Sequence, residues 1–219
     1  MQLERKPTTQ RQEEQETAVH TRHSRGLLFV LSAPSGAGKD SVIEGLRQQG
    51  VDFHVVASVT TRPPRPGESE GHPYYFISKE EFDRLAASDE LLEHANVHGN
   101  WYGQPRQQVR EQLGTGRDVI LKIDVQGAAT VRQKIPQAIL IFLKPESPEE
   151  LARRLSGRHT ESEQDLRRRQ ADAQNELAQQ NWYDYVIINR QGRLDEAVEQ
   201  LRAIMIAEHC RVQPRFIEV

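Results

Sequence analysis

From Gly26 onward, short apolar runs alternate with stretches in which apolar residues recur every three or four positions. The periodic stretches predict amphipathic helices, among them Ser41–Gln49, which Gly50 ends, and Leu194–His209. Strands that alternate with helices predict an α/β fold with a parallel, doubly wound sheet flanked by helices. The short apolar runs predict the buried strands Leu27–Ser32, Val119–Ile123, Ile139–Leu143 and Val186–Ile188.

Three helix starts are legible from their capping residues. Ser78-Lys79-Glu80-Glu81 is a capping box, and Ser147-Pro148-Glu149-Glu150 adds a proline at the first helical position. Thr160-Glu161-Ser162-Glu163 repeats the pattern before a long polar helix that is expected to end near Gln180. These patterns place helices between and beyond the predicted strands.

Two segments depart from the alternating pattern. Residues 1–25 are almost entirely polar and lack apolar periodicity, so we expect a disordered tail, with a helical, partner-binding tail as the alternative. His54–Tyr75 has strand character but is interrupted by prolines and glycines. It indicates a small β-containing lobe over residues 58–105, inserted between core segments 26–57 and 106–219.

Composition narrows the class of protein. The 219 residues suit one α/β domain with small insertions, and 36% hydrophobic residues suffice for one core. The net charge of −3 does not indicate nucleic-acid or membrane binding. Cys210 is the only cysteine, which excludes an internal disulfide framework. No apolar run approaches the ~20 residues of a membrane span, and no secretory signal begins the chain, so we expect a cytoplasmic protein.

The turn after the first predicted strand has the character of a phosphate-binding loop. Its residues are Ala33-Pro34-Ser35-Gly36-Ala37-Gly38-Lys39-Asp40-Ser41. Gly38 and Lys39 match the P-loop template, whereas Ala33 and Asp40 replace its first Gly and its Ser or Thr. Small residues let successive backbone N–H groups surround a phosphate at a helix N-terminus, and Lys39 would reach the β- and γ-phosphates of a nucleotide. The alternative is an ordinary glycine-rich turn.

Several further motifs occur in order at compatible spacing, and together they resemble the guanylate kinase family, in its bacterial form. The resemblance runs from about Leu27 to about His209, within an expected domain of residues 26–210. It implies a P-loop NTPase-type fold that transfers the γ-phosphoryl group of ATP to GMP with Mg²⁺, giving ADP and GDP in purine nucleotide metabolism. The motifs are Ser58-Val59-Thr60-Thr61-Arg62-Pro63-Pro64-Arg65-Pro66-Gly67-Glu68, Gly71-His72-Pro73-Tyr74-Tyr75-Phe76, Leu92-Glu93, Gly99-Asn100-Trp101-Tyr102-Gly103 and Ile123-Asp124-Val125-Gln126-Gly127.

The chemistry of the lobe residues fits a nucleoside monophosphate. A phosphate carrying about two negative charges suits the guanidinium forks of Arg62 and Arg65 and the phenols of Tyr74 and Tyr102. The alternative for the two arginines is a solvated surface loop. The resemblance assigns Ser58 to the same GMP-binding set.

Two further residues are candidates for recognising guanine. The carboxylate of Glu93 can accept from guanine N1–H and from its amino group, whereas a helix-surface charge is the alternative. Gln104 stands where the family commonly has Ser or Thr, and its amide N–H₂ would donate to guanine O6.

Asp124 ends an apolar strand and has three candidate roles. It can orient waters on Mg²⁺, accept from the guanine amino group as the resemblance implies, or simply cap the next helix. The family usually carries an acid two residues earlier, where this chain has Lys122. A second acid is therefore not available at that position.

The resemblance also implies a lid over residues 154–169 that brings Arg154, Arg158 and Arg169 to the ATP phosphates. A solvated basic helix face is the alternative, and His159 stands where the family usually has Gly. Asn189, which ends the last strand, resembles a residue near the adenine, with a strand-end turn as the other reading. No general base is needed, because the acceptor phosphate is already ionised.

The expected partners are ATP, GMP and dGMP, with Mg²⁺ as cofactor and Asp40 and Ser41 as candidate metal ligands. Two other functions remain as alternatives: a guanylate-kinase-like module that binds a phosphorylated peptide, and a kinase that phosphorylates a sugar phosphate. Such modules typically lose the lysine of the phosphate loop, and the sugar-phosphate kinase would not need Glu93. The oligomeric state is not indicated by the sequence.

Overall fold

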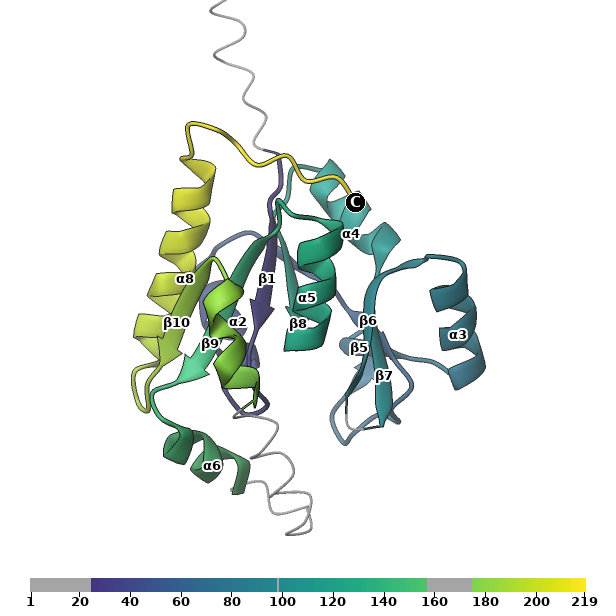
Figure 1. The fold of residues 1–219 in the computed structure, drawn as a ribbon, viewed down its shortest axis with the longest axis horizontal. Helices are drawn as coiled ribbons and strands as arrows, with labels where there is room; N and C mark the ends of the chain where they lie inside the picture. The colour runs from purple at the N-terminus through teal and green to yellow at the C-terminus, as the bar shows by residue number, and fades with distance from the viewer. Residues whose placement is uncertain (1–24, 98, 157–174) are drawn as a thin grey trace, which may run out of the picture.

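A computed structural model describes residues 25–97, 99–156 and 175–219 and contains two sheets. In the main sheet all five strands are parallel, in the order β10-β9-β1-β8-β2 (Figure 1). The four predicted strands are confirmed, and the two-residue β2 is an addition. The strands are β1 (Leu28–Ser32), β2 (His54–Val55), β8 (Val119–Ile123), β9 (Ile139–Pro145) and β10 (Tyr185–Asn189).

Helices cover both faces of this sheet, as the alternating pattern predicts. Phe29 and Leu31 of β1 belong to the core shared with α2 and α8, whereas Leu28 and Val30 belong to the core shared with α4 and α5. A strand buried on both faces has no polar side, which explains its continuous apolar run. The helices are α2 (Lys39–Gln48), α4 (Arg106–Gly114), α5 (Val125–Lys134) and α8 (Leu194–His209).

Helix boundaries agree with the capping residues. Helix α2 begins two residues earlier than expected, because Gly38 at its N-cap has φ 99° and turns the chain directly into the helix. Ser78 caps α3 (Lys79–Ala87) by accepting from the N–H of Glu81 at 3.1 Å. The hydroxyl of Ser147 likewise accepts from the backbone of α6 (Pro148–Ser156).

Two sequence predictions lie largely outside the described residues. These are the tail, apart from Arg25, and the cap at Thr160 with the helix that follows it. Near the expected end of that helix, a 3-10 helix spans Gln179–Trp182.

The lobe is a second, mixed sheet with strand order β4-β5-β3-β7-β6, and it stands beside the main sheet with α3 on its outer side (Figure 1). Phe82 of α3 packs there on Val59 and Leu91. The sheet begins at Ser58 and ends at Pro105. Its strands are β3 (Ser58–Thr60), β4 (Ser69–Glu70), β5 (Pro73–Phe76), β6 (Leu91–Val97) and β7 (Asn100–Pro105).

A specific hydrogen bond ties the lobe to a helix of the main sheet. The ammonium group of Lys134 on α5 donates to the carbonyl oxygen of Leu92 on β6 at 2.9 Å. Where the chain enters the lobe, the N–H of Ala57 donates to the side chain of Gln108 on α4 at 2.8 Å. Lobe residues such as Glu93 lie together with the residues at the carboxyl ends of β1 and β8, the edge where parallel α/β sheets bind ligands.

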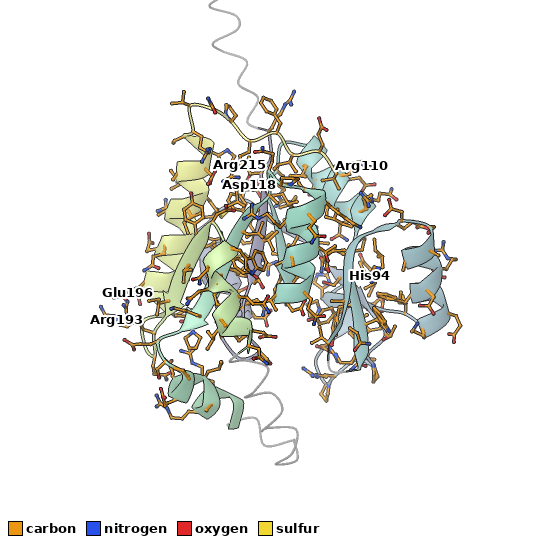
Figure 2. The ribbon with its side chains drawn as sticks, in the orientation of Figure 1. His94, Arg110, Asp118, Arg193, Glu196 and Arg215 are labelled. Atoms are coloured by element: carbon orange, nitrogen blue, oxygen red, sulfur yellow. The ribbon has the colours of Figure 1, made fainter. Side chains whose placement is uncertain are left out.

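The opposite end of the sheet is closed by the residues that follow α8. Arg215 pairs with the buried carboxylate of Glu208 at 2.9 Å, and Arg110 donates to the carbonyl oxygen of Val219 at 2.7 Å. Asp118, which lies near Arg215 in Figure 2, accepts from the backbone N–H of Leu27 and contacts the ring of His209. Across the described part of the chain, no helix combines the length and the apolar character that a membrane crossing requires.

Candidate functional site

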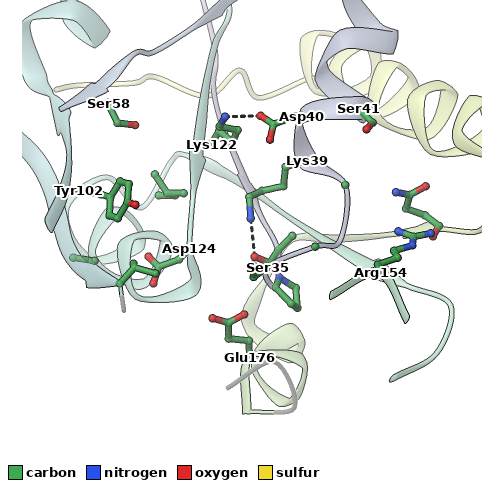
Figure 3. Close-up of a pocket in the computed structure, with 18 of the residues that line it drawn as sticks. Ser35, Lys39, Asp40, Ser41, Ser58, Tyr102, Lys122, Asp124, Arg154 and Glu176 are labelled. Atoms are coloured by element: carbon green, nitrogen blue, oxygen red, sulfur yellow. Dashed lines mark hydrogen bonds and ion pairs between the residues drawn. The ribbon is translucent and has the colours of Figure 1, made fainter. Parts of the chain in front are cut away.

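A cavity of about 630 Å³ lies between the carboxyl edge of the main sheet and the lobe (Figure 3). It collects most of the candidate residues from both sides. The main-sheet side contributes Ala33, Pro34, Ser35, Gly36, Gly38, Lys39, Asp40, Ser41, Lys122, Asp124, Arg154 and Asn189. The lobe side contributes Ser58, Arg65, Tyr74, Glu93, Tyr102 and Gln104.

The turn after β1 is held in shape by two residues from distant segments. Asn189 donates from its amide to the carbonyl oxygen of Ala37 at 2.8 Å. Arg154 donates to the same oxygen at 3.2 Å and to the backbone oxygen of Asn189 at 3.0 Å. Gly38 is required here, since a Cβ at this positive-φ position would lie 2.4 Å from the Asn189 amide nitrogen. Arg154 and Asn189 thus reach the loop, and Ala37, which does not line the cavity, takes part through its carbonyl group.

Lys39 places a cation at the mouth of the loop. Its Nζ donates to the carbonyl oxygen of Ala33 at 2.8 Å. Burial lowers the pKa of this ammonium group, Glu176 opposes the shift, and the nearby Lys122 adds to it. An anion in the cavity would favour the charged form of Lys39, because opposite charges in a partly dehydrated site attract.

Asp40 and Lys122 form an ion pair that the sequence analysis did not foresee. The Lys122 Nζ lies 2.5 Å from Oδ1 of Asp40 (Figure 3). The Asp40 side chain is 83% exposed, whereas that of Lys122 is only 12% exposed. Ser41, the other candidate metal ligand, is also exposed. No group of three or more His, Cys, Asp or Glu side chains suited to a metal ion occurs within the described ranges.

Glu93 is the most unusual ionisable group in the cavity. It is 2% exposed, and its Oε2 has no hydrogen-bond partner within the described structure. Burial, with a smaller contribution from the charge of Asp124, raises the pKa of this carboxyl group to about 8. A buried carboxyl group that lacks a partner is costly for the fold and suits a ligand that supplies donors.

The backbone of α5 approaches the Glu93 carboxyl group closely. A Cβ added at Gly127 would lie 2.5 Å from Oε2 of Glu93. Asp124 caps the same helix, with its Oδ1 accepting from the N–H of Gly127 at 3.0 Å. The capping role is therefore present, and Asp124 also lines the cavity.

Gln104 lies directly opposite Glu93 on the neighbouring strand. Its Nε2 donates to the hydroxyl of Ser58 at 2.6 Å, and its buried Oε1 has no partner in the described structure. The amide N–H₂ expected to serve a ligand is therefore engaged with Ser58. Since Ser58 can donate as well as accept, a rotation of the amide group by a half turn would free the donors.

The four residues expected to bind a monophosphate are partly assembled. Tyr74 and Tyr102 line the cavity with ring centroids 5.7 Å apart, and Arg65 lines it as well. Arg62 does not line it: its guanidinium lies 5.4 Å from the Tyr74 ring centroid and pairs with Glu68 at 2.9 Å.

Several site residues were outside the reach of sequence reasoning, and two predicted ones are not described. Arg158 and Arg169 lie outside the described residues. Gly127 was part of a recognised motif but had no assigned role, although its place at the start of a helix after an apolar strand was a usable signal. Lys134, which donates to the backbone of β6, belongs to no motif in the sequence that would have indicated this contact.

The arrangement combines two kinds of binding surface in one cavity. Small residues, a helix N-terminus and the cations Lys39 and Arg154 suit a chain of phosphates. Buried polar groups on the lobe, Glu93 and Gln104, suit a planar base that has several donors and acceptors. The space between them suits transfer of a phosphoryl group from one ligand to the other, which requires positioning and charge neutralisation above all.

Comparisons with known proteins agree with this picture. A family model described as guanylate kinase matches residues 25–208. The chain is 46% identical to a guanylate kinase of Synechococcus sp. (strain JA-3-3Ab) over 88% of both chains, and 48% identical to one of Dechloromonas aromatica (strain RCB) over 83% of this chain and 89% of the other. A crystal structure of guanylate kinase from Anaplasma phagocytophilum superposes with a TM-score of 0.71 at 35% identity, covering 86% of this chain and 89% of that one.

Proposed function

The chain belongs to the guanylate kinase family, whose members are ATP:GMP phosphotransferases, and on this premise we propose how its own residues carry out that reaction. The observation that carries the proposal is that a buried carboxyl group without a partner, Glu93, shares one cavity with the phosphate loop around Lys39. A donor-rich base and a triphosphate would then lie end to end.

Guanine is the base that fits the lobe. Its N1–H and amino group would donate to the two oxygens of Glu93, and its O6 would accept from Gln104 after the amide turns away from Ser58. The phosphate of GMP would meet the phenols of Tyr74 and Tyr102 and the guanidinium of Arg65, with Arg62 behind Tyr74. Residues 58–105 are thus proposed to be the GMP-binding lobe, and dGMP to be a weaker acceptor.

ATP is proposed to lie on the other side, with its β- and γ-phosphates on the loop from Ala33 to Ser41 and on the ammonium group of Lys39. Arg154 already reaches this loop and would turn to the phosphates. Residues 154–169 are proposed to form the lid, with Arg158 and Arg169 as further cations, and Asn189 to border the adenine. Neutralising the charge of the transferred group is the main catalytic task. We also propose a cytoplasmic location, in keeping with the single cysteine.

The residues fit a magnesium ion that arrives with ATP. Mg²⁺ is typically held by one or two carboxylates together with phosphates and water, and the exposed Asp40 carboxylate and Ser41 hydroxyl at the start of α2 are suitable oxygen donors. Asp40 and Ser41 would hold the ion there, and its chemistry would be to reduce the negative charge on the β- and γ-phosphates. The carboxylate of Asp124 would be available to accept hydrogen bonds from water molecules bound to the ion.

A coupled assay of ADP release tests the proposed function. GMP should support rapid turnover, dGMP slower turnover, and AMP, UMP and ribose phosphates none above background. Turnover of AMP comparable to that of GMP would contradict the assignment of Glu93. Turnover only with a ribose phosphate would favour a sugar-phosphate kinase, and absence of any turnover with retained binding of a phosphopeptide would favour an interaction module.

GMP binding is expected to strengthen as the pH rises from 7 to 8.5. With the pKa of Glu93 raised to about 8, most of the free protein carries a proton on the carboxyl group at pH 7. Guanine needs the ionised form, so binding must release that proton, and affinity should rise roughly five- to tenfold over this range before levelling off.

Calorimetric titration of GMP in two buffers of different ionisation enthalpy measures both the affinity and the proton release. The pH range of this titration lies above the second pKa of the phosphate, which is about 6, so the charge of the phosphate changes little within it. The control is Glu93→Gln, whose weaker binding should be independent of pH. A pH-independent affinity in the natural chain would show that Glu93 is already ionised before GMP binds.

Gly127→Ala should weaken GMP binding by about tenfold, because the new methyl group would displace the Glu93 carboxyl group at 2.5 Å. The matched control is Gly114→Ala, where a Cβ meets no atom within 4 Å in the described structure. Titration with GMP, alongside thermal unfolding of each variant, gives the comparison. Equal GMP affinities in the two variants would mean that Glu93 does not need this close approach.

A further inference from the structure

Lys122 occupies a position between the two halves of the cavity. It lies on β8 beside Leu31 of β1 and lines the cavity together with the phosphate loop and the lobe (Figure 3). Its side chain is mostly removed from water, and its Nζ has three N–H donors, of which one serves Asp40 among the residues that the structure describes. A largely buried ammonium group with unused donors requires anionic partners.

The groups around Lys122 come from both substrate sides. Asp40 of the phosphate loop contacts its Nζ at 2.5 Å. On the lobe side, the Nζ lies 5.6 Å from the ring centroid of Tyr74. It is also close enough to Lys39 to help lower the pKa of that ammonium group. Positive charge from two lysines thus gathers at the point where the phosphates of two nucleotides would meet.

The two members of the ion pair between Asp40 and Lys122 differ in their exposure to water. Asp40 is mainly exposed and is easily solvated by water, whereas Lys122 is mainly buried and is not. Exchanging Asp40 for a phosphate oxygen therefore costs little on the carboxylate side and keeps the buried ammonium group paired. The proximity of Tyr74 indicates the acceptor phosphate, since Lys39 already serves the phosphate loop.

We propose that Lys122 is an additional phosphate-binding residue of this enzyme, which contacts the phosphate of GMP, and that Asp40 is the counter-ion that pairs with its ammonium group until the phosphate displaces it. The proposal rests on the proposed function, because it requires GMP in the lobe. The charged residue of β8 that would face the substrate is then Lys122, at a position where the family usually has an acid.

Binding of GMP and of guanosine, each measured by calorimetry without ATP and Mg²⁺, separates a phosphate contact from a structural effect. Lys122→Gln should weaken GMP roughly 10- to 100-fold, the range of a hydrogen bond to a charged group. It should leave the affinity for guanosine unchanged. Lys122→Arg should keep most of the GMP affinity, and Lys79→Gln, which removes an exposed lysine paired with Asp83, should change neither ligand.

Asp40→Asn tests the second half of the proposal in the same assay. With the competing carboxylate removed, the natural Lys122 should bind GMP severalfold more tightly. In the Lys122→Gln background, Asp40→Asn should have no effect, because Asp40 acts through the ammonium group. A severalfold gain in both backgrounds would instead mean that Asp40 repels the phosphate directly, and its role as the displaced counter-ion of Lys122 would be wrong.

Two outcomes overturn the phosphate contact. Equal losses of GMP and guanosine affinity in Lys122→Gln would indicate a structural role, and unchanged GMP affinity in a folded Lys122→Gln would show that Lys122 does not meet the phosphate. The natural chain separates this failure from a failure of the proposed function. If it phosphorylates GMP while Lys122→Gln binds GMP normally, the present proposal alone is wrong. If it neither binds nor phosphorylates GMP, both are wrong.

Discussion

Glu93→Gln is expected to lower kcat/KM for GMP by roughly 10²- to 10³-fold while making the protein more stable. The loss follows from the donors of guanine: two N–H groups meet a carboxylate that accepts both, whereas the amide of Gln accepts only one and places its own N–H₂ against the other. A buried donor left without an acceptor, or facing a second donor, carries the full cost of its dehydration.

The gain in stability follows from the raised pKa of Glu93. Folding stabilises the protonated form, so the contribution of this group is fully present below the unfolded pKa of about 4.5 and is lost as the pH rises through about 8. Each unit by which folding raises the pKa of Glu93 corresponds to about 1.4 kcal/mol of the free energy of unfolding. Above pH 8, burial of the ionised carboxylate therefore lowers the stability of the protein by a few kcal/mol. Gln cannot ionise and avoids this loss, because a neutral amide occupies the same space.

Thermal unfolding at pH 5 and pH 8.5, together with steady-state kinetics, measures both effects. The melting temperature of Glu93→Gln should exceed that of the natural chain by more at pH 8.5 than at pH 5. Glu80→Gln on α3, where the carboxylate is exposed, is the matched control and should leave kcat/KM unchanged. A variant that loses GMP turnover without becoming more stable at pH 8.5 would contradict the raised pKa.

Lys39→Met is expected to lower kcat by roughly 10²- to 10³-fold with little change in the affinity for GMP. The ammonium group lies at the phosphate loop, where it donates to the carbonyl oxygen of Ala33, and would turn to the transferred phosphoryl group. Removing one fixed charge that faces developing negative charge in a water-poor site typically has an effect of this size.

The fold should tolerate this change, because burial already disfavours the charged form of Lys39 and Met fills a similar volume. Steady-state kinetics with saturating ATP and GMP gives kcat, and calorimetry gives the GMP affinity. Lys144→Met, which removes a lysine outside the cavity that donates to Gln180, serves as the control. A kcat within twofold of the natural value would show that the loop does not hold the phosphates as proposed.

The main sheet was largely predictable from local patterns. Strand β1 is buried on both faces, and so is β9 from Ile139 to Leu143, so these sequences are continuous apolar runs that few other structures require. Strand β8 follows the same pattern except at Lys122. The sequence pattern indicated strand character for the segment that begins at His54 but did not place β2 in the main sheet, because β2 has only two residues, His54 and Val55, whose ladder depends on the neighbouring β8. A short edge strand has no periodicity of its own.

The candidate site was predictable where it is contiguous in the chain. The turn from Ala33 to Ser41 combines small residues, Lys39 and the start of a helix within nine positions, so its phosphate-binding character is local. The lobe residues needed the resemblance to the family as well, since an isolated Glu93 resembles any surface carboxylate. Its burial beside Gly127 became visible only in three dimensions.

By itself, the sequence determined the order of strands and helices, the phosphate loop and the family, because these depend on neighbouring residues and on motifs that keep their spacing. Only the tertiary structure decided that Lys122 pairs with Asp40, 82 positions earlier, that Arg62 stands behind Tyr74, and that Glu93 lacks a partner. The physical reason is that charge pairing and dehydration depend on which distant groups share a space, and that is settled by how the sheet and the lobe pack together.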